Sequence, residues 1–506
     1  MGLISARAPA VAREAGFRPV PLAMAAVLVA SSAALLAVAL GQSRLTVQAA
    51  GVGALLFGVL LLAVRERSLL LLVGYVLACQ RLFYRPLGPI DGEVAGGVPG
   101  LYVRSVDALL IVLFAAWLAE GTLVRDLRDA LRRPGVAVPL LAPLAALPSV
   151  LVAESPYLAL SELYRMGWML ALYVYVAARL RDRRSVMVVL AALFAIPFIQ
   201  LAVELAQWAT QSTLGLVRVG EDPGLITRAA GETEIVRPAG TALHPVFLSA
   251  LLAPIALLAL SVGVSLRRPV PRLLCFASVA AGLAGMVLAQ TRVAFVAMVP
   301  LAFLLIVWAA RSGHLSSRAA ALVLAAGTLL VSVSVSVLYG NVVEAIARNF
   351  TSEQVGVEAS ARQQLNEVAL RVIRDAPVIG VGLNNYEQVL PRYDVYGVGL
   401  EGFPPHNLYL LVMADSGAIG LIGMGAAALA LVGIALRLAR VRDPQLSAVG
   451  VGALAMYAFF ALEELTSFSL RHDVPLLEFW IIAGLAAASL RIAEREASTP
   501  LQRSAQ

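Results

Sequence analysis

Apolar runs of about twenty residues recur along the whole chain, separated mostly by short polar segments. Such a run is long enough to cross a bilayer as an α-helix, whereas a membrane β-barrel would show short alternating segments. The pattern predicts an all-α fold, a polytopic transmembrane helix bundle of about 12 to 14 spans, with residues 1–506 forming a single integral membrane domain. We expect spans at about 20–40, 46–64, 68–84, 106–124, 136–153, 157–178, 185–209, 243–266, 273–290, 293–310, 319–339, 406–436, 448–466 and 474–490.

Two polar segments, 210–242 and 340–405, are too long to be simple connections, and loops of this length usually have a function. We expect both on the outer side of the membrane. The second carries an apolar stripe at helical spacing, formed by Val357, Ala361, Leu365, Val368 and Val372. This stripe predicts an amphipathic helix over 357–373, lying on the membrane or against the bundle.

The run 406–436 is longer than one straight crossing requires, which predicts a tilted helix or one broken near Gly417.

Composition and charge agree with a membrane protein. The chain is 60% hydrophobic and 14% charged, and its mean hydropathy is +0.84. It has no lysine, and most arginines fall in short segments on one side of the predicted spans. The positive-inside rule therefore places this side and both termini in the cytoplasm, and it explains the basic charge without a nucleic-acid partner. The cytoplasmic segments in this arrangement include 65–67, 125–133, 179–184, 267–272, 311–318 and 437–442.

Charged residues within the predicted spans are few, and each is costly in a bilayer. Glu162, Arg165, Glu204 and Asp415 all fall in the outer half of the predicted membrane region. Arg165 and Glu204 belong to consecutive spans, so they can form a structural ion pair. Alternatively, they line a polar cavity that opens outward.

Arg237, Arg292 and His406 lie at the outer ends of predicted helices. Each can be an interfacial anchor, because arginines often extend to lipid headgroups. Together they also suit a reaction: two guanidinium groups can hold a lipid diphosphate, and a neutral imidazole can accept a proton from an attacking hydroxyl. The outer loops have no paired aspartates of the DxD type, so we expect a metal-independent reaction that uses no cofactor.

Several segments resemble the O-antigen ligase and polymerase superfamily. HNLYLLVMADSGAIG (406–420) is similar to its signature of a histidine followed by Gly-x-x-Gly, and RDAPVIGVGLNNY (374–386) resembles the outer-loop segment before it. QTRVAF resembles the arginine turn of the family, and RPAGTALHP its upstream arginine-glycine element. Two departures are Thr291, where the family often has serine, and Asp415, where it often has glutamate.

The resemblance implies a bacterial inner-membrane enzyme with its active site facing the periplasm. Such enzymes move a glycan from an undecaprenyl-diphosphate carrier to an acceptor hydroxyl, with inversion. By analogy Arg237 and Arg292 bind the diphosphate, with Arg228 as an alternative to Arg237, and His406 activates or orients the acceptor hydroxyl. Asn407 of the motif and the cavity candidates Arg165 and Glu204 complete the expected substrate-binding set.

The expected partners are the lipid-linked donor, a glycan or lipid-linked sugar acceptor, and membrane lipids. Whether the chain is a ligase or a polymerase remains open, because the two share the motif and differ only in the acceptor. A ligase uses a lipid A–core sugar, and a polymerase uses another lipid-linked repeat. A lipid-linked oligosaccharide flippase or other transporter is the alternative from another class. The 340–405 segment and the lack of similarity between the two halves of the chain argue against it.

Overall fold

The computed structural model describes residues 67–89, 97–214, 227–230, 233–242, 244–313, 353–396 and 403–503, together with short pieces between 216 and 332. Seven helices in this part are long and apolar enough to cross a membrane, and the number rises to eight if the bent pair α4–α5 is one span. The expected spans 20–40, 46–64 and most of 319–339 lie outside the described residues. The seven are α9 (Arg183–Thr210), α10 (Pro245–Ser265), α11 (Pro269–Leu288), α12 (Arg292–Arg311), α17 (Leu408–Ala439), α18 (Pro444–Glu463) and α19 (Asp473–Arg503).

The earlier part of the bundle differs from the spans expected there. The run 68–84 forms only α3 (Arg67–Ala78), and 136–153 forms α6 (Pro134–Ala137), η1 (Val138–Leu140) and α7 (Leu141–Val150). Prolines in the second run interrupt its helical hydrogen bonding. The run 106–124 ends as α4 (Ser105–Ala119), after which the chain bends by 107° into α5 (Leu123–Leu131). The next helix is α8 (Pro156–Arg179), which has the length of a span and carries buried charges.

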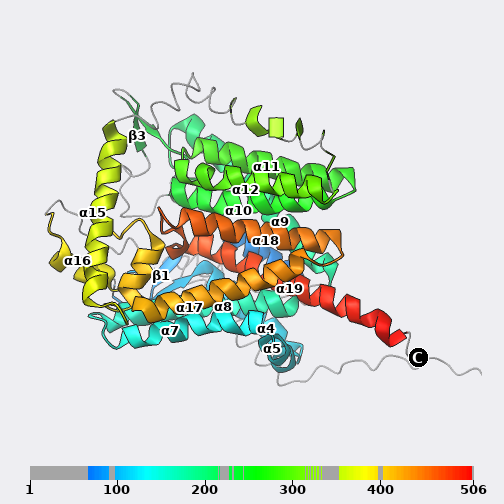
Figure 1. The fold of residues 1–506 in the computed structure, drawn as a ribbon, viewed down its shortest axis with the longest axis horizontal. Coiled ribbons are helices and arrows are strands. Elements are labelled where there is room, and N and C mark those ends of the chain that lie inside the picture. Colours follow the sequence, from blue (N-terminus) through cyan, green and yellow to red (C-terminus); the bar gives the residue numbers. More distant parts are fainter. Residues whose placement is uncertain are drawn as a thin grey trace, which may run out of the picture.

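The core is built around α10, which is apolar on every side and almost entirely buried. A helix without a polar face is expected inside a bundle. It packs against α11, α12 and α18, while α8 packs against α19 and α17 against α7. The long helices run roughly along one axis, so their ends gather at two ends of the molecule (Figure 1).

One end, the arginine-rich end, carries the α8–α9, α10–α11 and α17–α18 turns. Ion pairs connect these elements, among them Arg179–Glu120, Arg183–Asp443 and Arg183–Glu496, each at 2.6 Å. The opposite end carries α15 (Glu353–Asp375) and α16 (Tyr386–Tyr393), and we call it the α15 end (Figure 1). Its smaller elements are the antiparallel pairs β1 (Tyr84–Pro86) with β2 (Tyr102–Arg104) and β3 (Thr227–Ala230) with β4 (Thr233–Val236), and η3 (Ser469–Arg471).

The amphipathic helix expected over 357–373 is present as α15. Its stripe residues Leu365, Val368 and Val372 are buried with Tyr386 of α16 and Leu411 of α17 in a small apolar core. The stripe therefore packs against the bundle. The side chain of Val357 lies outside the described residues.

Candidate functional site

The two segments that carry the family motif and its preceding loop are joined through their backbones. Helix α17 breaks at Gly417, where φ is 61° and ψ is −166°, so of the two predicted alternatives, a tilted helix or a broken one, the structure has the break. Four hydrogen bonds of 2.9 to 3.2 Å run between residues 377–382 and residues 414–419, and we call this pair of segments the backbone clasp. The donors and acceptors are Val381 N to Ala414 O, Gly382 N to Asp415 O, Ala418 N to Pro377 O and Ile419 N to Val378 O.

The clasp satisfies backbone groups that the helix break would otherwise leave unpaired. In a bilayer such groups have no water to replace the lost partners. Gly380 has φ +72°, and a Cβ built there would overlap the carbonyl group of Asp415. A Cβ at Gly417 would likewise overlap the carbonyl group of Val378. The close approach of the two backbones therefore requires glycine at both positions.

Asp415 stabilises the same junction with its side chain. One carboxylate oxygen accepts hydrogen bonds from the backbone N–H groups of Asn385 (3.2 Å) and Tyr386 (2.9 Å), at the start of α16. The other oxygen lies 3.3 Å from a guanidinium nitrogen of Arg471. These contacts account for a carboxylate inside α17.

His406 precedes this helix in a tightly held segment. The side chain of Asn407 caps α17 by accepting from the N–H of Leu410 (3.1 Å), so its described contact is structural. The N–H of Leu408 donates to the carbonyl oxygens of Glu464 and Ser467, each at 3.0 Å. The imidazole therefore projects from a backbone that is fixed on the side that leads into α17.

The environment of His406 keeps its imidazole neutral. Its Nδ1 is buried and has no hydrogen-bond partner among the described residues. Burial, with the positive charge of Arg362 on α15 as a further cause, lowers the pKa of His406 to about 4. Both causes disfavour the protonated form.

Five rings connect His406 to two further histidines, and we call them the ring chain. Neighbouring centroids along it lie 3.5 to 5.6 Å apart, with Phe247 and His472 stacked at the shortest distance. Three of the four histidines of the protein belong to this chain. In order, the rings are His244, Phe247, His472, Phe468 and His406.

His244 shares the electrostatic environment of His406. It is the N-cap of α10, just outside the span, where its Nδ1 accepts from the N–H of Val246 (3.2 Å). Burial, then the charges of Arg237 and His406, lower the pKa of His244 to about 4. His244, His406, Arg237 and Arg362 thus form a group of nearby cationic or ionisable nitrogens, which we call the cationic group.

Arg237 reaches across the α15 end to the turn between α11 and α12. One guanidinium nitrogen donates to the carbonyl oxygens of Ala289 (3.1 Å) and Gln290 (3.4 Å). This contact brings Arg237 beside the backbone that leads into Arg292, the first residue of α12. Arg228 lies in β3 opposite Ile235. The side chains of Arg228 and Arg292 lie outside the described residues.

Two glutamines on α9, which sequence reasoning missed, hold the segment from Arg237 to His244. Gln207 accepts from the N–H groups of Ala239 (3.1 Å) and Gly240 (2.9 Å). Gln200 accepts from the N–H of Thr241 (2.9 Å) and donates to its hydroxyl (2.7 Å). The signal was present in the sequence, because two amides seven residues apart lie on one face of an apolar helix.

The expected pair between Arg165 and Glu204 does not form. Arg165 bonds Glu162 of its own helix (2.6 Å) and donates to the carbonyl oxygen of Arg471 (2.7 Å). Glu204 is fully buried beside Gly285, and its oxygens have no hydrogen-bond partner among the described residues. The two side chains therefore lie in separate environments, and the ion-pair expectation is wrong.

Arg165 instead belongs to a buried charge network of three arginines and four carboxylates. Its ion pairs span 2.6 to 3.6 Å, and none of its side chains is more than 7% exposed. The members are Arg104, Asp107, Glu162, Arg165, Asp415, Arg471 and Asp473.

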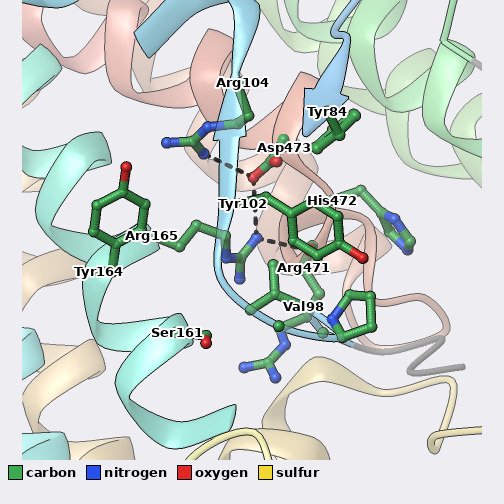
Figure 2. Close-up of a pocket in the computed structure, with 13 residues that line it drawn as sticks. Tyr84, Val98, Tyr102, Arg104, Ser161, Tyr164, Arg165, Arg471, His472 and Asp473 are labelled. Atoms are coloured by element: carbon green, nitrogen blue, oxygen red, sulfur yellow. Dashed lines mark hydrogen bonds and ion pairs between the residues drawn. The ribbon is translucent and has the colours of Figure 1, made fainter. Parts of the chain in front are cut away.

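An open cavity lies against this network, between α8, β2 and the start of α19. Figure 2 shows Asp473 between Arg104 and Arg165, with His472 at the cavity edge. Aromatic and hydroxyl side chains from Tyr84, Tyr102, Tyr164 and Ser161 complete its wall.

The α15 end therefore has two different electrostatic regions. Two arginines, Arg237 beside His244 and Arg362 beside His406, help to lower the pKa values of these histidines, so an anion is favoured beside them. The charge network, by contrast, neutralises its own arginines.

Residues 277–425 match the protein family described as O-Antigen ligase. The match covers the Arg292 turn, α15, the backbone clasp and His406. A search of curated proteins found no match. The match confirms the family resemblance drawn from the sequence motifs, and with seven long apolar helices it indicates a multi-pass membrane protein.

Proposed function

We propose that this chain, a member of the O-antigen ligase and polymerase superfamily, is an inverting membrane glycosyltransferase. It moves a glycan from an undecaprenyl-diphosphate carrier to an acceptor hydroxyl. The observation that carries the proposal is a buried, neutral His406 close to Arg362 of the cationic group at the α15 end. A neutral base next to fixed positive charge suits a reaction with an anionic leaving group.

In this reaction the acceptor oxygen attacks the anomeric carbon, and the bond from that carbon to the diphosphate oxygen breaks. The leaving diphosphate gains negative charge, which Arg237 and Arg292 neutralise, with Arg228 as the alternative to Arg237. Arginine stays charged and its planar fork matches phosphate oxygens. Attack from the face opposite the leaving group inverts the anomeric centre.

His406 accepts the proton of the attacking hydroxyl. Burial and the charge of Arg362 hold the pKa of His406 at about 4, which makes it a weak base. A bound diphosphate places negative charge nearby, and an opposite charge raises the pKa of an imidazole. Proton acceptance at His406 is therefore coupled to donor binding, so an acceptor is activated only when a donor is present.

The arginine-rich end belongs on the cytoplasmic side by the positive-inside rule. Both termini are then cytoplasmic, and the α15 end faces the periplasm of a bacterial inner membrane. The segments 210–242 and 340–405 become outer loops, which agrees with a donor carried to the outer leaflet.

Because arginines neutralise the leaving group, the reaction needs no metal, and transfer in reconstituted membranes should survive EDTA. Loss with EDTA and recovery with Mg²⁺ would contradict this part of the mechanism.

The deciding experiment uses purified protein, a defined undecaprenyl-diphosphate oligosaccharide and two acceptors, a lipid A–core sugar and a second lipid-linked repeat. Transfer to the first identifies a ligase and transfer to the second a polymerase. His406→Ala should abolish product while leaving membrane insertion and binding of undecaprenyl diphosphate intact. Unaltered glycan assembly in that variant would favour the transporter alternative.

A further inference from the structure

The cavity against the charge network carries chemistry that the diphosphate reaction does not use. We propose that it binds a neutral, hydroxyl-rich sugar residue of the glycan acceptor. This inference rests on the proposed function and deepens it, because it assigns the acceptor a place separate from the donor diphosphate.

The charge balance of the cavity wall argues for a neutral ligand. Arg104, Arg165 and Arg471 line the cavity, yet each is paired with buried carboxylates at 2.6 to 3.6 Å. Three arginines against four carboxylates leave the network with no surplus positive charge for a diphosphate. An anion here would face Asp473, which lies in the wall itself.

The remaining wall offers what a sugar ring needs. Tyr84 and Tyr102 lie edge to face with their ring centroids 6.1 Å apart, and Tyr164 approaches from α8. Tyrosines combine an apolar ring with a polar hydroxyl. Ligand sites commonly join such aromatic surface with a few placed polar groups, here guanidinium and carboxylate groups that can exchange hydrogen bonds with hydroxyls.

Hydrogen bonds within the protein hold the wall of the cavity in place. Its loop, residues 97–100, is held by Asn384, whose side chain accepts from the N–H of Val98 (3.3 Å) and donates to its carbonyl oxygen (2.8 Å). Arg471 also donates to Asn384 (3.1 Å). Asn384 has φ +57°, a left-handed conformation that asparagine adopts more readily than most residues other than glycine. A wall fixed in advance lowers the ordering cost of binding.

The cavity adjoins the proposed reaction centre. His472 lines the cavity and lies 5.6 Å from Phe468, whose ring lies 5.2 Å from His406. A single aromatic side chain thus separates the cavity edge from the proposed base. A sugar bound in the cavity can present a neighbouring unit of the same glycan to His406.

The test uses full-length protein in nanodiscs and two probes: undecaprenyl diphosphate, and the neutral lipid-free glycan released from the source bacterium by mild acid. Saturation-transfer NMR measures glycan binding, and a fluorescence titration measures undecaprenyl diphosphate. Tyr164→Phe should weaken glycan binding roughly two- to tenfold, the effect of one lost hydrogen bond. Ser161→Leu, which fills the cavity, should remove the glycan signal. Neither variant should change undecaprenyl-diphosphate affinity.

Two controls separate the regions. Tyr457→Phe makes the same change as Tyr164→Phe at a buried hydroxyl without a hydrogen-bond partner among the described residues, and it should alter neither probe. Arg362→Gln should lower the affinity for undecaprenyl diphosphate and leave glycan binding unchanged. In transfer assays, Tyr164→Phe should raise the KM for the acceptor and not for the donor.

The outcomes decide the inference independently of the proposed function. No glycan binding to the unmodified protein, or binding that Ser161→Leu leaves intact, overturns it. A raised KM for the donor assigns the cavity to the donor glycan and also overturns it. Cavity-dependent glycan binding by a protein that transfers nothing would support the sugar site and reject the transferase.

Discussion

Replacing Gly380 by alanine tests whether the backbone clasp holds the α15 end together. Gly380 has φ +72°, and the left-handed conformation costs a residue with a Cβ about 1–2 kcal/mol. The new Cβ would also overlap the carbonyl of Asp415 and lie 2.5 Å from the nitrogen of Ser416. Both are backbone groups, which cannot rotate away, so the two segments must separate.

Separation of the two segments would lengthen or break hydrogen bonds among the four in the clasp. Leaving a buried backbone group unpaired costs about 1–3 kcal/mol. Loss of two of these bonds together with the conformational strain gives a destabilisation of about 4 kcal/mol. Because the α17 part of the clasp begins eight residues after His406, the start of α17 should also shift and transfer should fall.

The assay is thermal unfolding of the purified protein in detergent, followed by intrinsic fluorescence, with transfer activity measured in parallel. Gly425→Ala is the matched control, since it makes the same change in α17 and its Cβ would meet no atom within 4 Å. This control should leave stability unchanged or raise it by up to about 1 kcal/mol through helix propensity. A Gly380→Ala protein as stable as the Gly425→Ala protein would refute the clasp.

Three further predictions concern the groups around the site. The pKa values of His244 and His406 are about 4 in the folded protein and about 6.5 in the unfolded chain, so the unfolded chain binds more protons between these pH values. The free energy of unfolding should therefore fall as the pH drops from 6.5 towards 4. Melting curves recorded at several pH values should show a smaller fall for the His244→Gln variant. Gln207→Leu leaves two backbone N–H groups unpaired, so it should lower stability by roughly 2 kcal/mol or more and raise the KM for the donor, measured by melting and steady-state kinetics. Glu204→Met removes a buried carboxylate that lacks a described partner, so it should raise the melting temperature and leave transfer rates unchanged. A large loss of transfer would instead support a role for Glu204 in substrate binding.

Much of the fold was predictable because hydrophobic length alone defines a span. The helices at 185–209, 243–266, 273–290, 293–310, 406–436 and 448–466 appear within about four residues of the expected bounds, and the helix at 474–490 starts where expected but continues past its expected end to 498. The break at Gly417 was predictable for a related reason, since the run exceeds one crossing and contains glycine. The early runs were harder, because prolines and bends shorten helices whose composition still reads as apolar.

The candidate site was only partly predictable. Motif residues such as His406 and Arg237 could be found, but their neighbours could not. Arg471 and His472 lie in a short connection about three hundred residues from Arg165, and only tertiary packing brings them together. The mistaken pairing of Arg165 with Glu204 has the same cause, because adjacency in sequence does not determine the rotation of a helix about its axis.

The backbone clasp has a consequence for how such a protein can diversify. Main-chain atoms alone make its four hydrogen bonds, so the side chains of Val378, Ile379 and Val381 do not contribute to them. Substitutions at these positions can accumulate over time while the two glycines keep the scaffold in register. The same framework can thus be inherited intact by descendants that handle different sugars.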